Sequence, residues 1–335
     1  MSPPPRLPFR FRFRPRSTLA LWGLVLAFAG CDGRSPQTQS VPDAGACVQG
    51  NCPQPDSGSP VDPSGTRVRI AAFNVHRLFD TVCDTGSCGG SNYEELPTEA
   101  EFEAQVSQLG RAITALNADI VMLEEVETQN SLDGLLKKVP QFPESRLGET
   151  YTKASVDVAV LSRHAITEVR SHRNLYIYRP DGSATRFSRD LLEVHVDVDG
   201  TRVIVFAAHF RSKVDDDPGR RLAEANASRD IVLQSATEFP DAMIVLGGDL
   251  NDIPGSEPIN ALDQALLRVA KDRPDNETWT YFYSGRGQAI DHLYLAPNGG
   301  GVYVPGSFRV AREPTGGYGG SDHGAVYADF ALTPR

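Results

Sequence analysis

The sequence predicts an α+β fold in which two packed β-sheets are flanked by helices. Short apolar runs of strand length recur between residues 66 and 332, and only two or three helical stretches interrupt them. The runs at 189–198 and 201–210 are joined by Asp199-Gly200, a dipeptide typical of a two-residue hairpin. Hairpin strands combined with few helices favour two sheets packed face to face, with the helices outside.

The first thirty residues have the pattern of a secretory signal peptide. Five arginines between residues 6 and 16 precede the apolar stretch LALWGLVLAFAG. A basic segment followed by a short apolar segment and small residues is typical of such a signal, and this stretch is too short for a comfortable membrane span. Ala29-Gly30-Cys31 resembles a lipoprotein cleavage box, which predicts a lipid anchor on Cys31. Ordinary secretion without an anchor is the alternative.

Residues 31–65 predict a disordered tether. They are rich in Ser, Pro, Gly, Gln and Asp and show almost no apolar periodicity. Such a segment cannot bury enough apolar surface to offset its ordering entropy. The remaining residues, 66–335, are sufficient for a single two-sheet domain with a large core.

The expected elements of this domain follow one another in order. Residues 66–75 alternate like a strand, and residues 97–117 place apolar side chains at helical spacing near a proline. Residues 118–127 form a buried strand that ends in carboxylates. Further strands are expected at 156–163, 189–198, 201–210, 289–297, 321–332 and in MIVLGGD from residue 243, and a charged helix at 217–238.

The charge of the chain excludes a protein that grips nucleic acid by a basic surface. The net charge is −10, and it falls to about −15 without the first thirty residues, which hold five arginines and no acid. A substrate that carries phosphate therefore requires a cation between itself and this protein.

Four cysteines besides Cys31 form two closely spaced pairs, Cys47 with Cys52 and Cys83 with Cys88. Exported chains form disulfides, so two local bridges are the simplest expectation. A zinc site is the competing interpretation, but companion histidines are missing near both pairs.

Eight polar residues stand at or just beyond the ends of apolar runs. They are Asn74, Glu125, His209, Asp249, Asn251, Asp291, Asp322 and His323. Each of them, taken alone, could instead be a turn residue, because Asp and Asn side chains form hydrogen bonds with the nearby backbone at strand ends. A set of eight indicates a shared site.

The chemistry of this set favours metal-assisted hydrolysis of a phosphoester. Its carboxylate and amide oxygens suit Mg²⁺, Mn²⁺ or Ca²⁺ better than zinc. The histidines have carboxylates beside them, as a general base and its orienting partner require. A divalent cation would neutralise this acidic pocket for an anionic substrate.

Eight motifs then resemble the endonuclease/exonuclease/phosphatase superfamily, and they occur in the order of that family. They are AAFNVHRLFD, ADIVMLEEVE, VAVLSR, SRDLLEV, AAHFRSK, LGGDLND, AIDHLYL and SDHGAV. The resemblance spans nearly all of residues 66–335 and implies the deoxyribonuclease-like four-layer fold, in agreement with the strand pattern above.

The resemblance implies a metal site for Mg²⁺, Mn²⁺ or Ca²⁺. Glu125 matches the principal metal ligand of the family, and Asn74 matches an asparagine that helps to bind metal or phosphate. Asp322 is expected close to the metal. Glu124 stands where glutamine is common, so we expect it to pack or to form a hydrogen bond nearby.

The resemblance also implies the catalytic residues. His323 matches the general base and Asp291 the carboxylate that orients it. Asp249 matches the aspartate that orients the nucleophilic water, and Asn251 matches the amide that holds the phosphate. Strand alternation would point these last two side chains to the same face.

Two further residues are expected to contact the phosphate. His209 matches a position that contacts phosphate or assists the leaving oxygen, and Arg189 matches an arginine that can reach phosphate. By contrast, His76, His164, His172 and His195 have no acidic partner in motif context and are expected to be structural. Trp279 and its neighbouring tyrosines are expected in the core or the rim rather than in a base-stacking surface.

The resemblance favours an exported, monomeric nuclease that cleaves DNA or RNA, and a lipid on Cys31 would hold it at a membrane. The acidity of the chain keeps a second interpretation open, a phosphatase or phospholipid phosphodiesterase of the same superfamily. A non-catalytic surface module is the alternative from another class, and it would predict broken motifs.

Overall fold

The computed structural model describes residues 65–333, which belong to one compact unit. The predicted signal peptide, Cys31, the tether up to residue 64 and the pair Cys47 and Cys52 lie outside the described residues. Within residues 65–333, no helix combines the length and the apolar character that crossing a membrane requires.

The first sheet has seven strands. Its path runs β15-β17-β1-β2-β4-β3, and β16 lies beside β17. The strands are β15 (Gly301–Tyr303), β17 (Ala325–Leu332), β1 (Arg67–Leu78), β2 (Ile120–Val126), β4 (Asp157–Ser162), β3 (Glu144–Leu147) and β16 (Arg309–Ala311). Because β1 pairs antiparallel with β17 and parallel with β2, the first and last strands of the domain are neighbours inside this sheet.

The second sheet has six strands in the order β11-β14-β10-β9-β8-β5. They are β11 (Leu267–Arg268), β14 (Asp291–Leu295), β10 (Met243–Asp249), β9 (Thr201–His209), β8 (Leu192–Val198) and β5 (Ala165–Ser171). β9 and β10 pair in parallel, whereas β8 and β9 form the hairpin predicted from Asp199-Gly200. Both turn residues have the positive φ angles that this hairpin needs, 51° and 83°.

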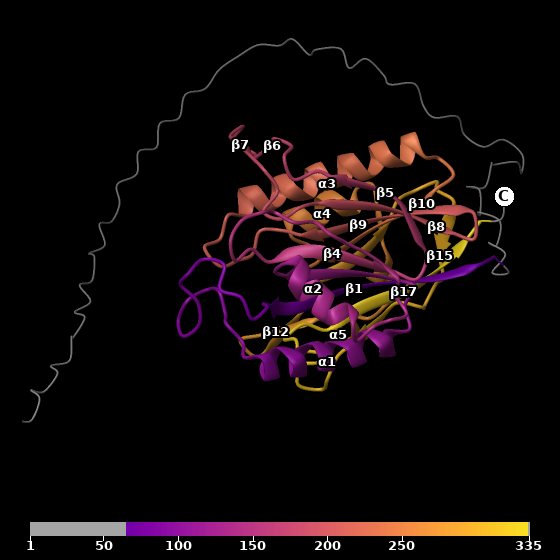
Figure 1. Cartoon of the computed structure of the whole chain (residues 1–335). Helices are drawn as coiled ribbons and strands as arrows, with labels where there is room; N and C mark the ends of the chain where they lie inside the picture. The colour runs from indigo at the N-terminus through magenta and orange to yellow at the C-terminus, as the bar shows by residue number, and fades with distance from the viewer. Residues whose placement is uncertain (1–64, 334–335) are drawn as a thin grey trace, which may run out of the picture. The chain divides into compact units, whose positions relative to one another are not determined.

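The two sheets pack face to face around an apolar core. This core joins buried valines, isoleucines and leucines of both sheets, such as Ile70 of β1 and Val205 of β9. Helices α1 (Glu99–Leu116) and α2 (Gln129–Leu136) cover the outer face of the first sheet, and α3 (Pro218–Glu238) and α4 (Glu257–Asp263) cover the second (Figure 1). The predicted two-sheet sandwich with outer helices is therefore confirmed.

The strands carry their polar ends to one common edge of the sandwich. In the second sheet, Asp249 at the end of β10 is opposite both His209 of β9 and Asp291 of β14. In the first sheet, Asn74 of β1 is opposite Glu124 of β2. Residues far apart in sequence thus meet because parallel neighbours in each sheet end at the same side.

Several elements were not predicted from the sequence. The described residues form five α-helices rather than two or three, because the short α2, α4 and α5 (Asp275–Thr278) were missed. Two small hairpins also appear, β6 (Ile177–Tyr178) with β7 (Ala184–Thr185), and β12 (Tyr281–Tyr283) with β13 (Arg286–Gln288). The structure confirms the predicted bridge between Cys83 and Cys88, which lies in the loop after β1.

Candidate active site

A buried cluster of Asp249, Asp291 and His323 occupies the common edge of the two sheets. Each of these side chains offers a ligand atom, and the three atoms lie within 4.8 Å of one another. His323 Nδ1 lies 3.0 Å from Asp291 Oδ2, and His323 Nε2 lies 3.9 Å from Asp249 Oδ2. The Asp291 carboxylate therefore orients the His323 imidazole through Nδ1. The other ring nitrogen, Nε2, faces the Asp249 carboxylate and remains available to a substrate.

The segment that carries His323 is fixed to the strands on both sides of it. The Ser321 hydroxyl donates to the Asn74 carbonyl at 2.7 Å and accepts from the His323 amide at 3.0 Å. The ring of Tyr281 lies 4.9 Å from the His323 ring. Burial lowers the pKa of His323, but the charges of Asp291 and Asp249 outweigh it and raise this pKa to about 10. The two carboxylates therefore stabilise the charged form that the imidazole takes when it accepts a proton.

Asp249 is the second titrating group of the cluster. Burial, followed by the charge of Asp291, raises its pKa to about 7. Its Oδ2 accepts a hydrogen bond from Asn74 Nδ2 at 3.0 Å, and its Oδ1 accepts one from the backbone amide of Asn251 at 2.9 Å. Asp249 is thus a carboxylate held in place by two hydrogen bonds.

Glu125 reaches the same site through a β-bulge. The register between β2 and β4 shifts between Glu124 and Val126, and the extra residue Glu125 has a φ of 68°. A bulge redirects a side chain that regular alternation would send elsewhere. The Glu125 carboxylate accepts from Arg77 N at 2.9 Å and from Asn74 Nδ2 at 3.2 Å. Strain of this kind is typical of functional sites.

The donor set at this edge fits a hard divalent cation. The carboxylates of Glu125 and Asp249 both accept a hydrogen bond from the side-chain amide of Asn74. Among the described residues, the basic side chain closest to the Glu125 carboxylate is His209, at 4.0 Å. Oxygen ligands from carboxylate and amide groups suit Mg²⁺ or Mn²⁺. The carboxylates of Glu125 and Asp249 would hold such an ion beside Asn74, whose Nδ2 donates to both of them and whose Oδ1 accepts from the His76 backbone amide.

His209 is buried beside this group of oxygens. Its Nε2 lies 3.6 Å from Asp249 Oδ2, and its Nδ1 has no hydrogen-bond partner in residues 65–333. Burial and then the charge of Arg189 lower the pKa of His209 well below its usual range. The imidazole is therefore neutral.

Asn251 reaches the site by a different route from the one predicted. Strand β10 ends at Asp249, so strand alternation does not orient Asn251, which has a φ of 53° in the following turn. Its side-chain amide donates to the Phe210 carbonyl at 3.1 Å. This contact fixes the turn below the cluster and leaves the Oδ1 atom for a ligand.

Asp322 and His76 form a pair that was not predicted. Asp322 is half-exposed, and its Oδ1 lies 2.9 Å from His76 Nδ1 at the entrance to the site. This partner of His76 lies far away in sequence, outside its motif, and His172 and His195 also have an acidic partner in space, since both lie 2.7 Å from Glu193. The bond to Asp322 raises the pKa of His76.

Glu124 lies below the cluster and is fully buried. Neither of its carboxylate oxygens has a hydrogen-bond partner among the described residues, so the expected nearby hydrogen bond is not formed. Burial, followed by the charges of Asp291 and Asp249, raises its pKa well above the usual range. A neutral glutamic acid at this point resembles, in shape and charge, the glutamine that the resemblance implied.

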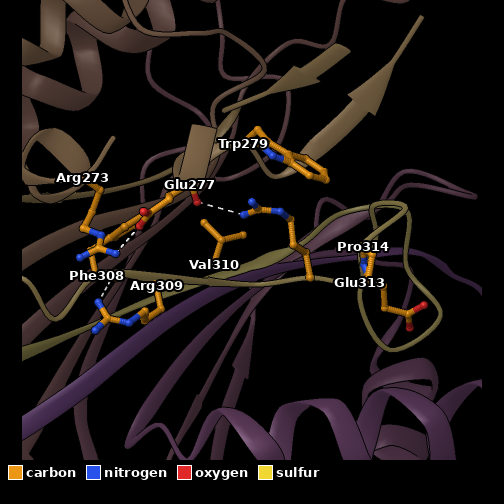
Figure 2. A pocket seen from close by; sticks show the side chains of 9 residues that line it. Arg273, Glu277, Trp279, Phe308, Arg309, Val310, Glu313 and Pro314 are labelled. Atoms are coloured by element: carbon orange, nitrogen blue, oxygen red, sulfur yellow. Dashed lines mark hydrogen bonds and ion pairs between the residues drawn. The ribbon is translucent and has the colours of Figure 1, made fainter. Parts of the chain in front are cut away.

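Two features near the cluster do not belong to it. His292 is buried and its Nε2 contacts the Asp252 carbonyl at 2.9 Å, so it does not face the site. A hollow of about 460 Å³ lies between α5 and β16 and is lined by Trp279, Arg273, Glu277 and Arg309 among others (Figure 2). None of the clustered acids or histidines lines this hollow.

Comparisons with known proteins agree with this geometry. Residues 71–323 match the model of the Endonuclease/Exonuclease/phosphatase family. Among solved structures, TDP2 from Caenorhabditis elegans is similar, with 16% identity, a TM-score of 0.58, and coverage of 80% of this chain and 75% of that one. A Bacteroides vulgatus endonuclease/exonuclease/phosphatase is also similar, with 16% identity, a TM-score of 0.56, and coverage of 80% and 99%.

A third similar structure contains nucleic acid. It is D. rerio TDP2 complexed with a single-strand DNA product, with 17% identity, a TM-score of 0.53, and coverage of 80% of this chain and 100% of that one. No curated protein matches the chain in sequence. At these identities the solved structures support the fold.

Proposed function

Because the chain belongs to the Endonuclease/Exonuclease/phosphatase family, we propose that it is a metal-dependent phosphodiester hydrolase that cleaves DNA or RNA. Members of this family are generally hydrolases of phosphoester bonds and typically use divalent metal ions. The observation that carries the proposal is the convergence of Asp249, Asp291 and His323 within 4.8 Å, beside the carboxylate of Glu125.

A divalent ion at Glu125 and Asp249, beside Asn74, would act as a Lewis acid toward a phosphate oxygen. The acidic site cannot accept a phosphodiester without such neutralisation. His209, which is buried beside Asp249, and Arg189, which the resemblance assigns to phosphate, are proposed to donate hydrogen bonds to the other phosphate oxygens. The side chain of Asn251 is held at the same edge.

The activation of water is assigned to Asp249 and His323. Asp249, held by the Asn74 side chain and the Asn251 backbone amide, orients the attacking water. Asp291 keeps the Nε2 of His323 directed at the site, so this nitrogen accepts the proton of the water as the new O–P bond forms and returns it to the leaving oxygen as the other P–O bond breaks. This division is the one that the resemblance implies.

A plasmid assay tests the proposed function. Supercoiled DNA incubated with the protein and Mg²⁺ should be nicked, and RNA should be tested in parallel. Asp249→Ala and His323→Ala should each lose at least about 10³-fold in rate while remaining folded. Asp197→Asn, at the opposite end of the second sheet, is the control and should retain activity. Normal turnover by either site variant would contradict the assignment.

A second candidate substrate is a phospholipid. Exposed apolar side chains occur on several loops at the edge of the site, including Val82, Tyr151, Val214 and Ile253. Such side chains can contact a lipid surface. Intact plasmid together with hydrolysis of sphingomyelin or of a small phosphomonoester would replace the nuclease proposal with this one.

We also propose that the protein is exported and anchored by a lipid on Cys31. The basic and apolar segments before this cysteine support the proposal. Cells grown with labelled palmitate should incorporate the label into the wild-type protein and not into Cys31→Ser. Equal labelling of the two proteins would contradict the anchor.

A further inference from the structure

We infer that the β12–β13 hairpin is a nucleotide-binding subsite in which Tyr283 stacks on a base next to the scissile phosphate and Arg286 contacts the adjoining phosphate. The inference rests on the proposed nuclease function, and it specifies a single-stranded nucleic acid as the substrate. The hairpin was expected to belong to the core or the rim, and none of the roles assigned above uses it apart from the contact of Tyr281 with His323.

Aromatic rings form a continuous series from the catalytic cluster to the solvent. Tyr281 pairs with His323 as an isolated β-bridge, and their rings lie 4.9 Å apart. The Tyr281 and Tyr283 rings lie 6.4 Å apart with an interplanar angle of only 15°, so they are nearly parallel. Tyr283 is 59% exposed. The outermost ring of this series is therefore free to receive another flat group.

The two faces of the hairpin are clearly different. Residues two apart on a strand share one face, so Tyr281 and Tyr283 project together and Phe282 projects oppositely. Phe282 packs on Trp279 with ring centres 5.9 Å apart. A Cβ on Gly287, which is opposite Phe282, would lie 2.5 Å from Trp279 Cγ. One face is thus anchored to Trp279, and the tyrosines belong to the other.

A cation accompanies the exposed tyrosine. Arg286 is opposite Tyr283 in the hairpin register, and cross-strand partners lie on the same face. Arg286 is exposed and forms no ion pair with any residue of 65–333. A flat ring beside an unpaired guanidinium matches a nucleotide, which presents a base for stacking and a phosphate for the cation.

Stacking explains how so acidic a chain can hold nucleic acid. With a net charge of −10, the protein repels a phosphate backbone, whereas the stacking of a base on a tyrosine does not depend on charge. Bases inside a duplex are already stacked on one another and cannot reach Tyr283. The subsite therefore selects a single strand, or an unpaired nucleotide at an end or a gap.

The test compares three tyrosine variants on single-stranded oligonucleotides with the intact protein and Mg²⁺. Tyr283→Ala should raise KM about tenfold and leave kcat within about twofold, whereas Tyr283→Trp should keep the wild-type KM. Tyr178→Ala is the matched control, since Tyr178 is 65% exposed on the other small hairpin. Hydrolysis of bis(4-nitrophenyl) phosphate should not change in Tyr283→Ala, and Arg286→Ala should also raise the oligonucleotide KM.

The outcomes separate this inference from the proposed function. Cleavage by the wild type with an unchanged KM in Tyr283→Ala, or an equal rise in Tyr178→Ala, overturns the subsite and leaves the nuclease intact. Failure of the wild type to cleave any oligonucleotide overturns both. If Tyr283→Ala instead loses binding to sphingomyelin vesicles and keeps its oligonucleotide KM, the hairpin contacts lipid and the subsite is wrong.

Discussion

Gly248 is the residue through which the packing of the second sheet can be tested most directly. It lies next to Asp249 on β10, where the chain runs beside β9. Its φ is 135°, and an ideal Cβ placed on it would lie 2.0 Å from the Ala208 carbonyl oxygen and 2.8 Å from Glu124 Oε1. Both contacts are too short for real atoms, so Gly248→Ala must move β10 away from β9.

The expected loss of stability has two parts. Forcing an extra carbon into a packed site costs about 1–3 kcal/mol, and an unfavourable φ for alanine costs about 1–3 kcal/mol more. We therefore expect Gly248→Ala to lower the free energy of unfolding by about 4 kcal/mol. Gly255→Ala is the control, because Gly255 has a φ of 90° but open space around its Cβ position. It should show only the backbone part, about 1–2 kcal/mol.

Activity should fall more sharply than stability. His209 Nε2 and Asp249 Oδ2 are 3.6 Å apart across β9 and β10, and the separation of these strands displaces one from the other. A displacement of about 1 Å in a catalytic group costs about 100-fold in rate. Urea unfolding and DNA cleavage below the transition provide the two measurements. Equal unfolding free energies for the two glycine variants, with normal cleavage by Gly248→Ala, would refute this reasoning.

Three further predictions address other parts of the molecule. EDTA should abolish hydrolysis, and Mg²⁺ or Mn²⁺ should restore it and raise the melting temperature; full turnover in chelator would exclude a metal-dependent reaction. Glu193 is buried, which raises its pKa, but its bonds to His172 and His195 outweigh burial and lower this pKa to about 2. A carboxyl group whose pKa is lowered by folding stabilises the folded state at pH values above its pKa in the unfolded chain. This stabilisation is lost as the pH falls through its pKa in the folded state. Glu193→Gln should therefore cost about 3 kcal/mol at pH 7, and the difference should shrink between pH 4.5 and 2; a constant difference would contradict it. Replacing Cys83 and Cys88 by serine should cost about 2 kcal/mol in urea unfolding, and unchanged stability would show that the bridge constrains nothing.

Sequence periodicity predicted the long elements well because their burial is regular. β1, α1, β8, β9 and β10 all follow apolar runs that a strand or helix of that length must bury. The hairpin of β12 and β13 was missed, although Ser284-Gly285 between aromatic residues is a recognisable two-residue turn signal. Its strands have only three residues each, so periodicity alone cannot identify them.

The site residues were predictable where a motif fixes the local geometry. Asp291 and His323 meet as expected because Asp291 begins β14 and His323 lies two residues before β17. Glu125 could be recognised from its motif, but its bulge could not, since the register shift arises from pairing with β4. The pair of His76 with Asp322 spans the whole domain, and no local pattern in sequence connects residues so distant.

The placement of β17 beside β1 has a consequence for an incomplete chain. β17 follows every other described strand in sequence, yet it lies inside the first sheet next to β1, the first described strand. A chain that stops before His323 therefore exposes an unpaired inner edge and also lacks the imidazole of the site. The same short segment therefore completes both the first sheet and the site, so an incomplete chain lacks both.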